Sequence, residues 1–217
     1  RNLIGFKFAF QVPAYSLNSS LEIVLYLILG LTAALIGIMF IRMLNLAENV
    51  FDRWKFPQLF KPAVGGLLLG LVGLAYMHLP NLSFPAGSAA HGGALDIPIP
   101  HMYGSGFPSI QAAIQGHTPL WILVALIFLK PLATSLTLGS GNSGGVFAPS
   151  LFIGAMLGGA MGHLFHWWFP EIGLNTGAFA LVGMAALFSA PARAPLTAML
   201  LVFEMSNDYF MILPLMV

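Results

Sequence analysis

The chain has 217 residues, of which 58% are hydrophobic and only 7% are charged. A soluble domain draws about a quarter of its residues from Asp, Glu, Lys and Arg, so this composition predicts a protein that lies in a lipid bilayer. The net charge of +1 excludes the clustered basic surface that nucleic-acid binding requires, and the lack of cysteine excludes disulfides and cysteine-ligated metals.

The two ends of the sequence are typical of a piece of a longer membrane protein. The first residue is Arg1, and residues 209–217 at the other end are still apolar and helix-like. Residues 1–11 lack the charged region and cleavage site of a signal peptide. We therefore expect targeting information to lie outside this segment.

The first long apolar run covers residues 23–41 and is followed by the most charged part of the chain, residues 42–61. A helix of about 19 residues at about 1.5 Å per residue nearly matches the hydrocarbon core of a bilayer. The run therefore predicts a membrane-spanning helix, and the charged stretch predicts a surface connection. The charged stretch has two more basic than acidic residues, and by the positive-inside rule this excess favours the cytoplasmic side.

A second apolar run covers residues 62–79 and contains Gly66 and Gly70. Small residues four positions apart allow two helices to approach closely within a membrane. The next stretch, residues 80–108, is crowded with proline and glycine. We expect a long loop or a broken, re-entrant segment there.

A short helix is predicted at residues 110–114, and a clear apolar span covers residues 120–138 with Lys130 inside it. An ionisable group at membrane depth usually contacts water, a carbonyl group or an opposite charge. We therefore expect Lys130 to have a polar partner rather than to lie among lipid tails.

The next predicted helix covers residues 146–165 and places glycines four positions apart on one face, at positions 154, 158 and 162. Apolar helices at residues 178–189 and 195–203 are too short to span a bilayer alone. Short, interrupted helices at membrane depth indicate backbone that is buried in protein or lines a cavity.

The glycine-rich turn GSGNSGGVFAP at residues 139–149 is the candidate binding site of this chain. The first turn of a helix leaves N–H groups without internal partners, and its dipole places about half a positive charge there. The N–H groups of Gly145, Val146 and Phe147 could therefore hold an anion and still release it, because no full positive charge is involved. From these residues alone, a tight Gly-Gly turn before a packed helix is the simpler explanation.

The same turn also carries a family resemblance. The segment SGNSGGVFAPSLFIGAMLGG, residues 140–159, closely resembles the GxFxP signature region of the CLC family of chloride channels and chloride–proton antiporters. Nearly the whole chain from about Leu25 is similar to this family. Further matching stretches occur in the family's order at residues 25–30, 107–114, 190–197, 202–205 and 213–214.

The resemblance implies an all-α integral membrane protein with a CLC-type inverted-repeat bundle of tilted, partly broken helices. Residues 1–217 would form part of one transmembrane domain. Residues 21–61 would supply the last helix of the first repeat and its connection, and residues 62–217 most of the second repeat, truncated in its final helix. The family also implies a multi-pass protein of the cell membrane and a homodimer in which each subunit has its own pore. It places the connection at residues 42–61 outside the cell, whereas the positive-inside rule applied to its two excess basic residues favours the cytoplasmic side.

The implied function is transport of chloride or a similar monovalent anion, by a voltage-gated-type channel or a chloride/proton antiporter. No cofactor or metal and no enzymatic activity are expected. Val146 and Phe147 match the positions whose backbone amides coordinate the central chloride, next to the amide of Gly145. Gly144, Ala148 and Pro149 would shape the loop. The family's serine loop, gating glutamate, internal proton-pathway glutamate and pore tyrosine have no match in this segment.

Two alternatives remain. Residues 141–144 also fit the GxSG motif of rhomboid-type intramembrane serine proteases, in which a histidine activates the serine. However, His163 lies 20 residues beyond Ser143, about 30 Å along a helix. His163 and His166 precede two tryptophans, which is typical of a membrane-interface belt rather than a metal site. Another inverted-repeat solute transporter would share the broken helices but not the upstream CLC loops.

Overall fold

The computed structural model describes residues 21–55, 57–77, 101–116, 118–206 and 212–216, and these residues form helices and short connections without a strand. Two short 3₁₀ turns, η1 (Gln58–Phe60) and η2 (Pro170–Ile172), lie between longer helices. The α-helices are α1 (Leu21–Arg53), α2 (Lys61–Met77), α3 (Phe107–Ile114), α4 (Leu120–Gly139), α5 (Phe147–Trp168), α6 (Thr176–Ala192), α7 (Pro195–Ser206) and α8 (Ile212–Met216).

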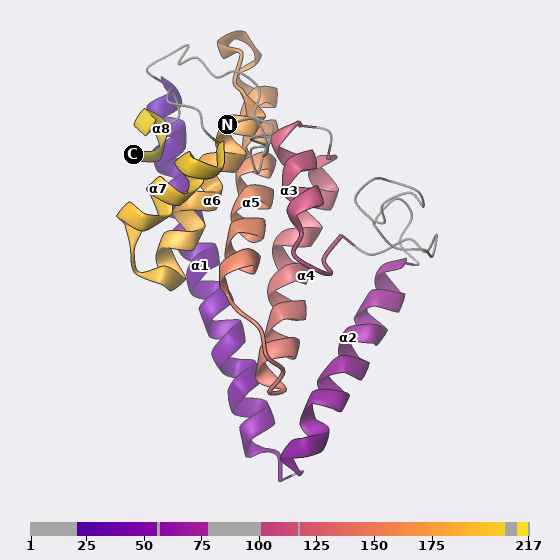
Figure 1. Ribbon diagram of the computed structural model, residues 1–217. Coiled ribbons are helices and arrows are strands. Elements are labelled where there is room, and N and C mark those ends of the chain that lie inside the picture. The colour runs from indigo at the N-terminus through magenta and orange to yellow at the C-terminus, as the bar shows by residue number, and fades with distance from the viewer. Residues whose placement is uncertain (1–20, 56, 78–100, 117, 207–211, 217) are drawn as a thin grey trace, which may run out of the picture.

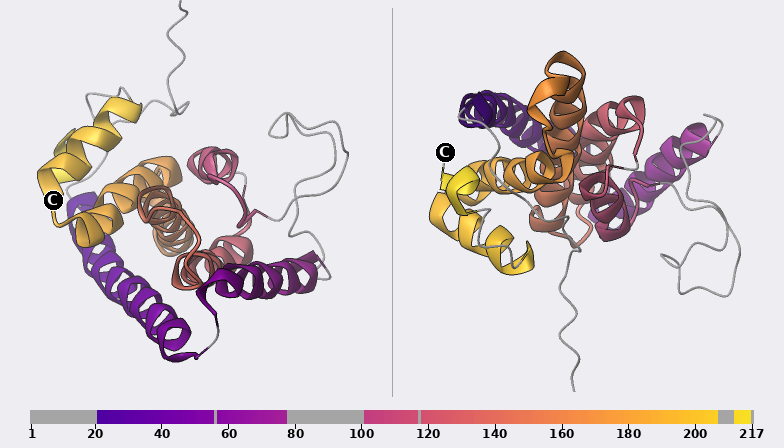
Figure 2. Two further views of the ribbon diagram at one scale, coloured as in Figure 1. Left: turned by 60° about the horizontal axis from the view of Figure 1, so that its bottom comes forward. Right: turned by 90° about the horizontal axis from the view of Figure 1, so that it is seen from above.

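The helices surround α5. In Figure 1, α1 and α2 form a V that closes at the lower end of the molecule, and α4 and α5 stand between its arms. Figure 2 shows α5 near the centre, with α4 and α6 beside it. The shorter helices α6, α7 and α8 lie along the upper part of α1. This arrangement buries the middle of α5, residues 150–160, as expected for a stretch that carries glycines in place of large side chains.

Within the described residues, four helical segments are long and apolar enough to cross a membrane: Leu21–Arg53, Gln58–Tyr76, Leu120–Gly139 and Phe147–Trp168. Each agrees with a predicted apolar run. One boundary is wrong, because α1 continues as a helix to Arg53 through most of the stretch predicted to be a surface connection. The charged residues of that stretch occupy its exposed faces, while Phe51 is buried, so the helix tolerates them.

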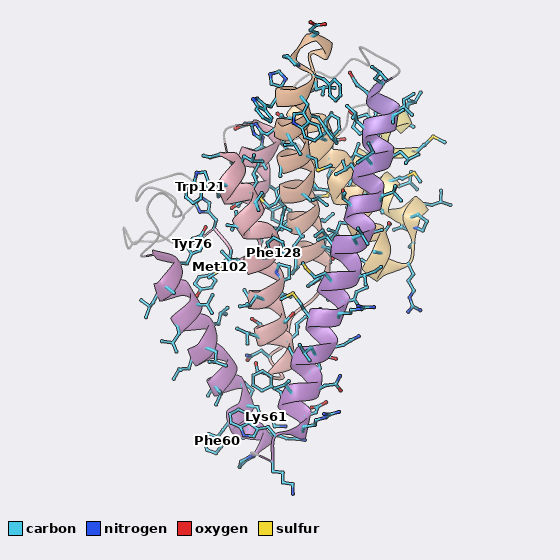
Figure 3. The ribbon with its side chains drawn as sticks, turned by 180° about the vertical axis from the view of Figure 1, so that it is seen from behind. Phe60, Lys61, Tyr76, Met102, Trp121 and Phe128 are labelled. Carbon is cyan, nitrogen blue, oxygen red and sulfur yellow. The ribbon has the colours of Figure 1, made fainter. Side chains whose placement is uncertain are left out.

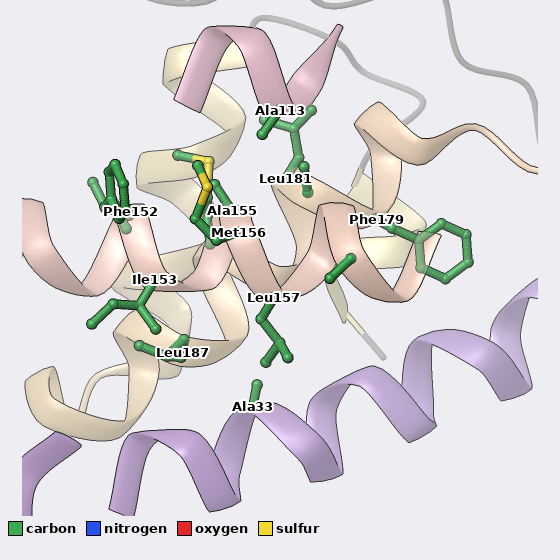
Figure 4. Close-up of a cluster of buried hydrophobic side chains, with 14 of the residues drawn as sticks. Ala33, Ala113, Phe152, Ile153, Ala155, Met156, Leu157, Phe179, Leu181 and Leu187 are labelled. Carbon is green, nitrogen blue, oxygen red and sulfur yellow. The ribbon is translucent and has the colours of Figure 1, made fainter. Parts of the chain in front are cut away.

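The contact between α5 and α6 is made by backbone, as the glycine spacing predicts. A Cβ atom at Gly158 would clash with the carbonyl oxygen of Phe179, and a Cβ atom at Gly154 would clash with that of Gly183. Figure 4 shows the apolar side chains around this contact, with Leu157 of α5 pointing toward Ala33 of α1. Small residues on both helices therefore let α5 and α6 approach closely where lipid supplies no hydrophobic drive.

The close approaches of α2 differ from the prediction. Gly66 and Gly70 face open space within the described residues, whereas Gly65 lies against Ser140 and Gly73 against the ring of Tyr103. Positions 65 and 73 are eight residues apart and share one helix face, since every fourth residue returns to the same side. The angle at which α2 crosses α4 thus selects a glycine face that the GxxxG pattern alone does not identify.

We expect the substitution Gly158→Ala to destabilise the full-length protein, because its Cβ would overlap the Phe179 carbonyl. Overpacking of this kind costs about 1–3 kcal/mol. The matched control is Gly159→Ala on the same helix, where a Cβ would lie 3.4 Å from Leu123 in ordinary contact. Thermal unfolding in detergent measures both variants, and equal midpoints would contradict the packing described here.

Candidate functional site

A cavity of about 220 Å³ lies between α2, α4 and the turn that precedes α5. It is much larger than the roughly 30 Å³ that one water molecule occupies in the liquid, so it has room for a small ion with water. Among the described residues that line it, Lys130 alone is charged, and no carboxylate takes part. The residues that matter for its chemistry are Met102, Gly104, Lys130, Gly144, Gly145 and Pro149.

The turn before α5 doubles back along α4 instead of leaving the helix bundle. Asn142 N–H donates to the Thr137 carbonyl at 3.2 Å, and Gly144 lies so close to Leu138 that a Cβ would come within 2.9 Å. Gly141 has a φ of 90°, a conformation that glycine adopts readily and other residues rarely do. As a result, α5 begins beside α4 rather than at the end of the molecule (Figure 1).

The start of α5 offers main-chain N–H groups without an internal partner. Phe147 and Ala148 are the first residues of the helix, where no preceding helical carbonyl is available, and Pro149 has no N–H group. The N-cap residue is Val146, which provides no side-chain cap, and its carbonyl accepts a bond from the Ser150 N–H at 3.0 Å. Donors and helix dipole together make this end of α5 suitable for an anion.

The structure brings the predicted site residues to the cavity unequally. Gly144, Gly145 and Pro149 line it, whereas Val146 and Phe147 lie next to the lining residues and are 36% and 41% exposed. The Phe147 ring turns toward α6 and meets Phe188 edge to face, with 5.1 Å between the ring centres. The side chain of Phe147 thus packs on α6, and its backbone is what remains for an anion.

Comparison with known proteins identifies the family. Residues 1–217 match the family model described as "Voltage gated chloride channel". The chain belongs to this family. It is 34% identical over 218 residues to a putative chloride channel protein, ClcB-like, from Ralstonia nicotianae, a match that covers all of this chain and 45% of the relative. It is 33% identical over 207 residues to the H(+)/Cl(-) exchange transporter ClcA of Vibrio cholerae, covering 95% of this chain and 40% of that protein.

A solved structure of the family supports the fold directly. The crystal structure of a slow cyanobacterial Cl⁻/H⁺ antiporter superposes with a TM-score of 0.73 at 29% identity, covering 97% of this chain and 44% of that one. The chain therefore spans less than half the length of the relatives it matches. With its four membrane-competent helices, it is a multi-pass segment of a CLC membrane protein.

The buried lysine of this CLC chain has the polar partners that its sequence position predicts. Lys130 is only 5% exposed, and its ammonium donates to the carbonyl oxygens of Met102 at 2.8 Å and Gly104 at 2.9 Å. The ring of Phe152 lies below it, with 4.9 Å from Nζ to the ring centre. The prediction that Lys130 has a polar partner is confirmed.

Sequence reasoning missed the segment at residues 101–106, which forms one wall of the cavity. Tyr103 O–H donates to the Leu69 carbonyl at 2.5 Å, and Tyr76 pairs with Nδ1 of His101 at 3.3 Å. Figure 3 shows Tyr76 and Met102 between α2 and α4. The sequence feature that could have indicated this segment is the pair of glycines at positions 104 and 106 before α3. Both have a positive φ in the structure. The rest of the predicted loop at residues 80–108 lies largely outside the described residues.

The geometry does not support the protease alternative. Ser143 lies in the exposed turn before α5, while His163 is 16 residues into that helix, about 24 Å from its start. His166 lies farther along. In the part of the chain that the structure describes, no group of three or more His, Asp or Glu side chains could hold a metal ion.

We expect Gly141→Ala to destabilise the turn before α5, because a non-glycine residue at this positive φ costs about 1–3 kcal/mol. The expected result is a lower thermal midpoint of the full-length protein. Ser143→Ala in the same turn provides the control and should unfold like the wild type. An unchanged midpoint for Gly141→Ala would show that the turn has another conformation.

Proposed function

We propose that the protein containing this chain transports chloride or a similar monovalent anion across the cell membrane, as a channel or a chloride/proton exchanger. It needs no cofactor and is not an enzyme. The anion is held by the main-chain N–H groups of Gly145, Val146 and Phe147 at the start of α5. The observation that carries the proposal is the start of α5 beside α4, next to a cavity whose described lining residues include no carboxylate.

The physical argument is that backbone amides bind an anion with moderate strength. They supply partial positive charge, so chloride exchanges part of its hydration shell for N–H donors and is not held directly by a cation. Gly144 allows the turn to pass close to Leu138, and Pro149 leaves the first helical turn with one donor fewer to satisfy. Ala148 between them is small and half-buried, so it leaves space at the helix start.

The names of the relatives also support chloride transport. ClcA of Vibrio cholerae and of Yersinia pestis are called H(+)/Cl(-) exchange transporters, at 33% and 36% identity to this chain. The similar solved structure is that of a Cl⁻/H⁺ antiporter. Reconstitution of the full-length protein in vesicles tests the proposal: chloride flux is expected. Proton movement against a chloride gradient would indicate exchange, and chloride flux without it would indicate a channel.

We expect Val146→Pro to weaken chloride binding, because it deletes one N–H donor. A hydrogen bond to a charged group contributes about 1.5–3 kcal/mol, so affinity should fall about ten- to a hundredfold. Val146→Ile keeps the donor and should remain within a few-fold of the wild type. Calorimetric titration of the full-length protein with chloride measures both variants.

The proline variant also restrains Gly145, so its thermal midpoint must first show that it folds. A folded Val146→Pro protein with wild-type affinity would reject the amide site. Ser143→Ala is expected to transport chloride normally. If that change abolished activity while the amide changes did nothing, the serine would have to carry the function.

We further propose a homodimer in the lipid bilayer, with contacts from α1 and the last two helical segments. Large apolar side chains remain exposed there, including Leu31 and Leu35 of α1 and Leu196 and Leu200 of α7. In a membrane such a surface meets lipid, the rest of the same polypeptide or a second subunit, and we propose the second subunit. Part of the last segment, residues 207–211 and 217, lies outside the described residues.

A single cysteine tests the dimer, since this chain contains none. In a cysteine-free full-length background, Leu200→Cys should form a disulfide-linked dimer in membranes. Leu67→Cys, which is equally exposed but on α2, should not. Monomer alone at every protein density, with cross-linkers at several α7 positions, would contradict the proposal.

A further inference from the structure

The segment at residues 102–104 is held against the cavity from two sides. On one side, Tyr103 O–H donates to Leu69 of α2 at 2.5 Å. On the other side, the Lys130 ammonium from α4 bonds the carbonyl oxygens of Met102 and Gly104. These three contacts fix a short stretch of irregular backbone between two membrane helices. Met102, Tyr103 and Gly104 line the same cavity as Gly144 and Gly145.

The two carbonyl oxygens create an electrostatic problem for an anion cavity. A carbonyl oxygen carries partial negative charge, and in a low-dielectric region it would repel a chloride ion strongly. The ammonium of Lys130 donates a hydrogen bond to each of these carbonyl oxygens and adds a full positive charge to the same wall of the cavity. An apolar side chain would fill this space without the desolvation penalty of a buried ammonium, so the gain from lysine lies in its charge and its donors.

We propose that Lys130 is a positioning residue for anion binding. Its ammonium holds the 102–104 backbone in place and neutralises the carbonyls of Met102 and Gly104, so that the wall facing the turn at Gly144 and Gly145 accepts an anion. This rests on the proposed function, because it assumes that the cavity is part of the anion path. Lys130 acts through the backbone of residues 102–104, and the amides at the start of α5 remain the ligands.

The test compares Lys130→Gln, Lys130→Arg and Lys130→Met in the full-length protein, with chloride titrated by calorimetry. Gln retains a neutral donor but loses the charge, and Met retains only the approximate length. Loss of a charge-assisted bond should weaken chloride binding about tenfold or more in both variants. Arg keeps charge and donors, so it should restore the affinity to within about threefold of the wild type. Lys55→Gln, at an exposed lysine outside the cavity, should leave affinity unchanged.

Hydrogen exchange gives a second readout. In the Gln and Met variants the amides of residues 102–106 should exchange faster than in the wild type, and Arg should restore their protection. A purely structural lysine would change the thermal midpoint without this pattern of loss and rescue in chloride affinity. Should the Gln and Met variants fail to fold, Tyr103→Phe removes the other contact of the same wall and should itself lower chloride affinity severalfold.

The possible outcomes distinguish a failure of the proposed function from a failure of the role proposed for Lys130. A wild-type protein that does not bind chloride would reject the proposed function. A wild-type protein that binds chloride, with wild-type affinity in a folded Lys130→Gln or Tyr103→Phe variant, would overturn the role of Lys130 and leave the proposed function intact. Weak binding that Arg fails to rescue would also overturn it, because charge and donors would then not be the cause.

Discussion

The backbone contact between α5 and α6 is the constraint on which the rest of this structure depends. Gly154 and Gly158 place the α5 backbone directly on the carbonyl groups of α6. In a bilayer, lipid tails are as apolar as leucine, so helices associate through close packing and satisfied polar groups rather than through hydrophobic burial. The contact holds α5 at the centre of the helix bundle. The N-terminal end of α5 therefore lies beside α4, next to the cavity.

The cavity lies between α2, α4, the segment at 102–104 and the turn before α5, and among its described lining residues only Lys130 is charged. Gly144 and Gly145 line this cavity, and the first turn of α5, which follows them, has N–H groups without internal acceptors. The irregular segment at 102–104 brings carbonyl oxygens to the opposite wall, where Lys130 bonds two of them. Non-helical backbone at membrane depth is tolerated where it lines such a cavity and its polar groups are satisfied.

Much of the architecture could be predicted from residue patterns. Apolar runs located the four membrane-competent helices, and the glycine spacing of α5 identified its packing face. The end of α1 could not be predicted, because charged side chains interrupt an apolar pattern without interrupting a helix that keeps them on exposed faces. The packing face of α2 depends on its angle to α4, so Gly65 and Gly73 make contacts and, within the described residues, the GxxxG pair makes none.

The sequence by itself determined that this chain lies in a membrane, that a glycine-rich turn precedes a long apolar helix, and that Lys130 needs a polar partner. These follow from local composition, since the bilayer penalises every unsatisfied polar group. Only the tertiary structure decided which groups meet. The carbonyls that bond Lys130 lie 28 and 26 residues earlier in the chain, and α4 lines one cavity together with their segment and the turn before α5. Such pairings depend on helix crossings over the whole bundle, which no local pattern encodes.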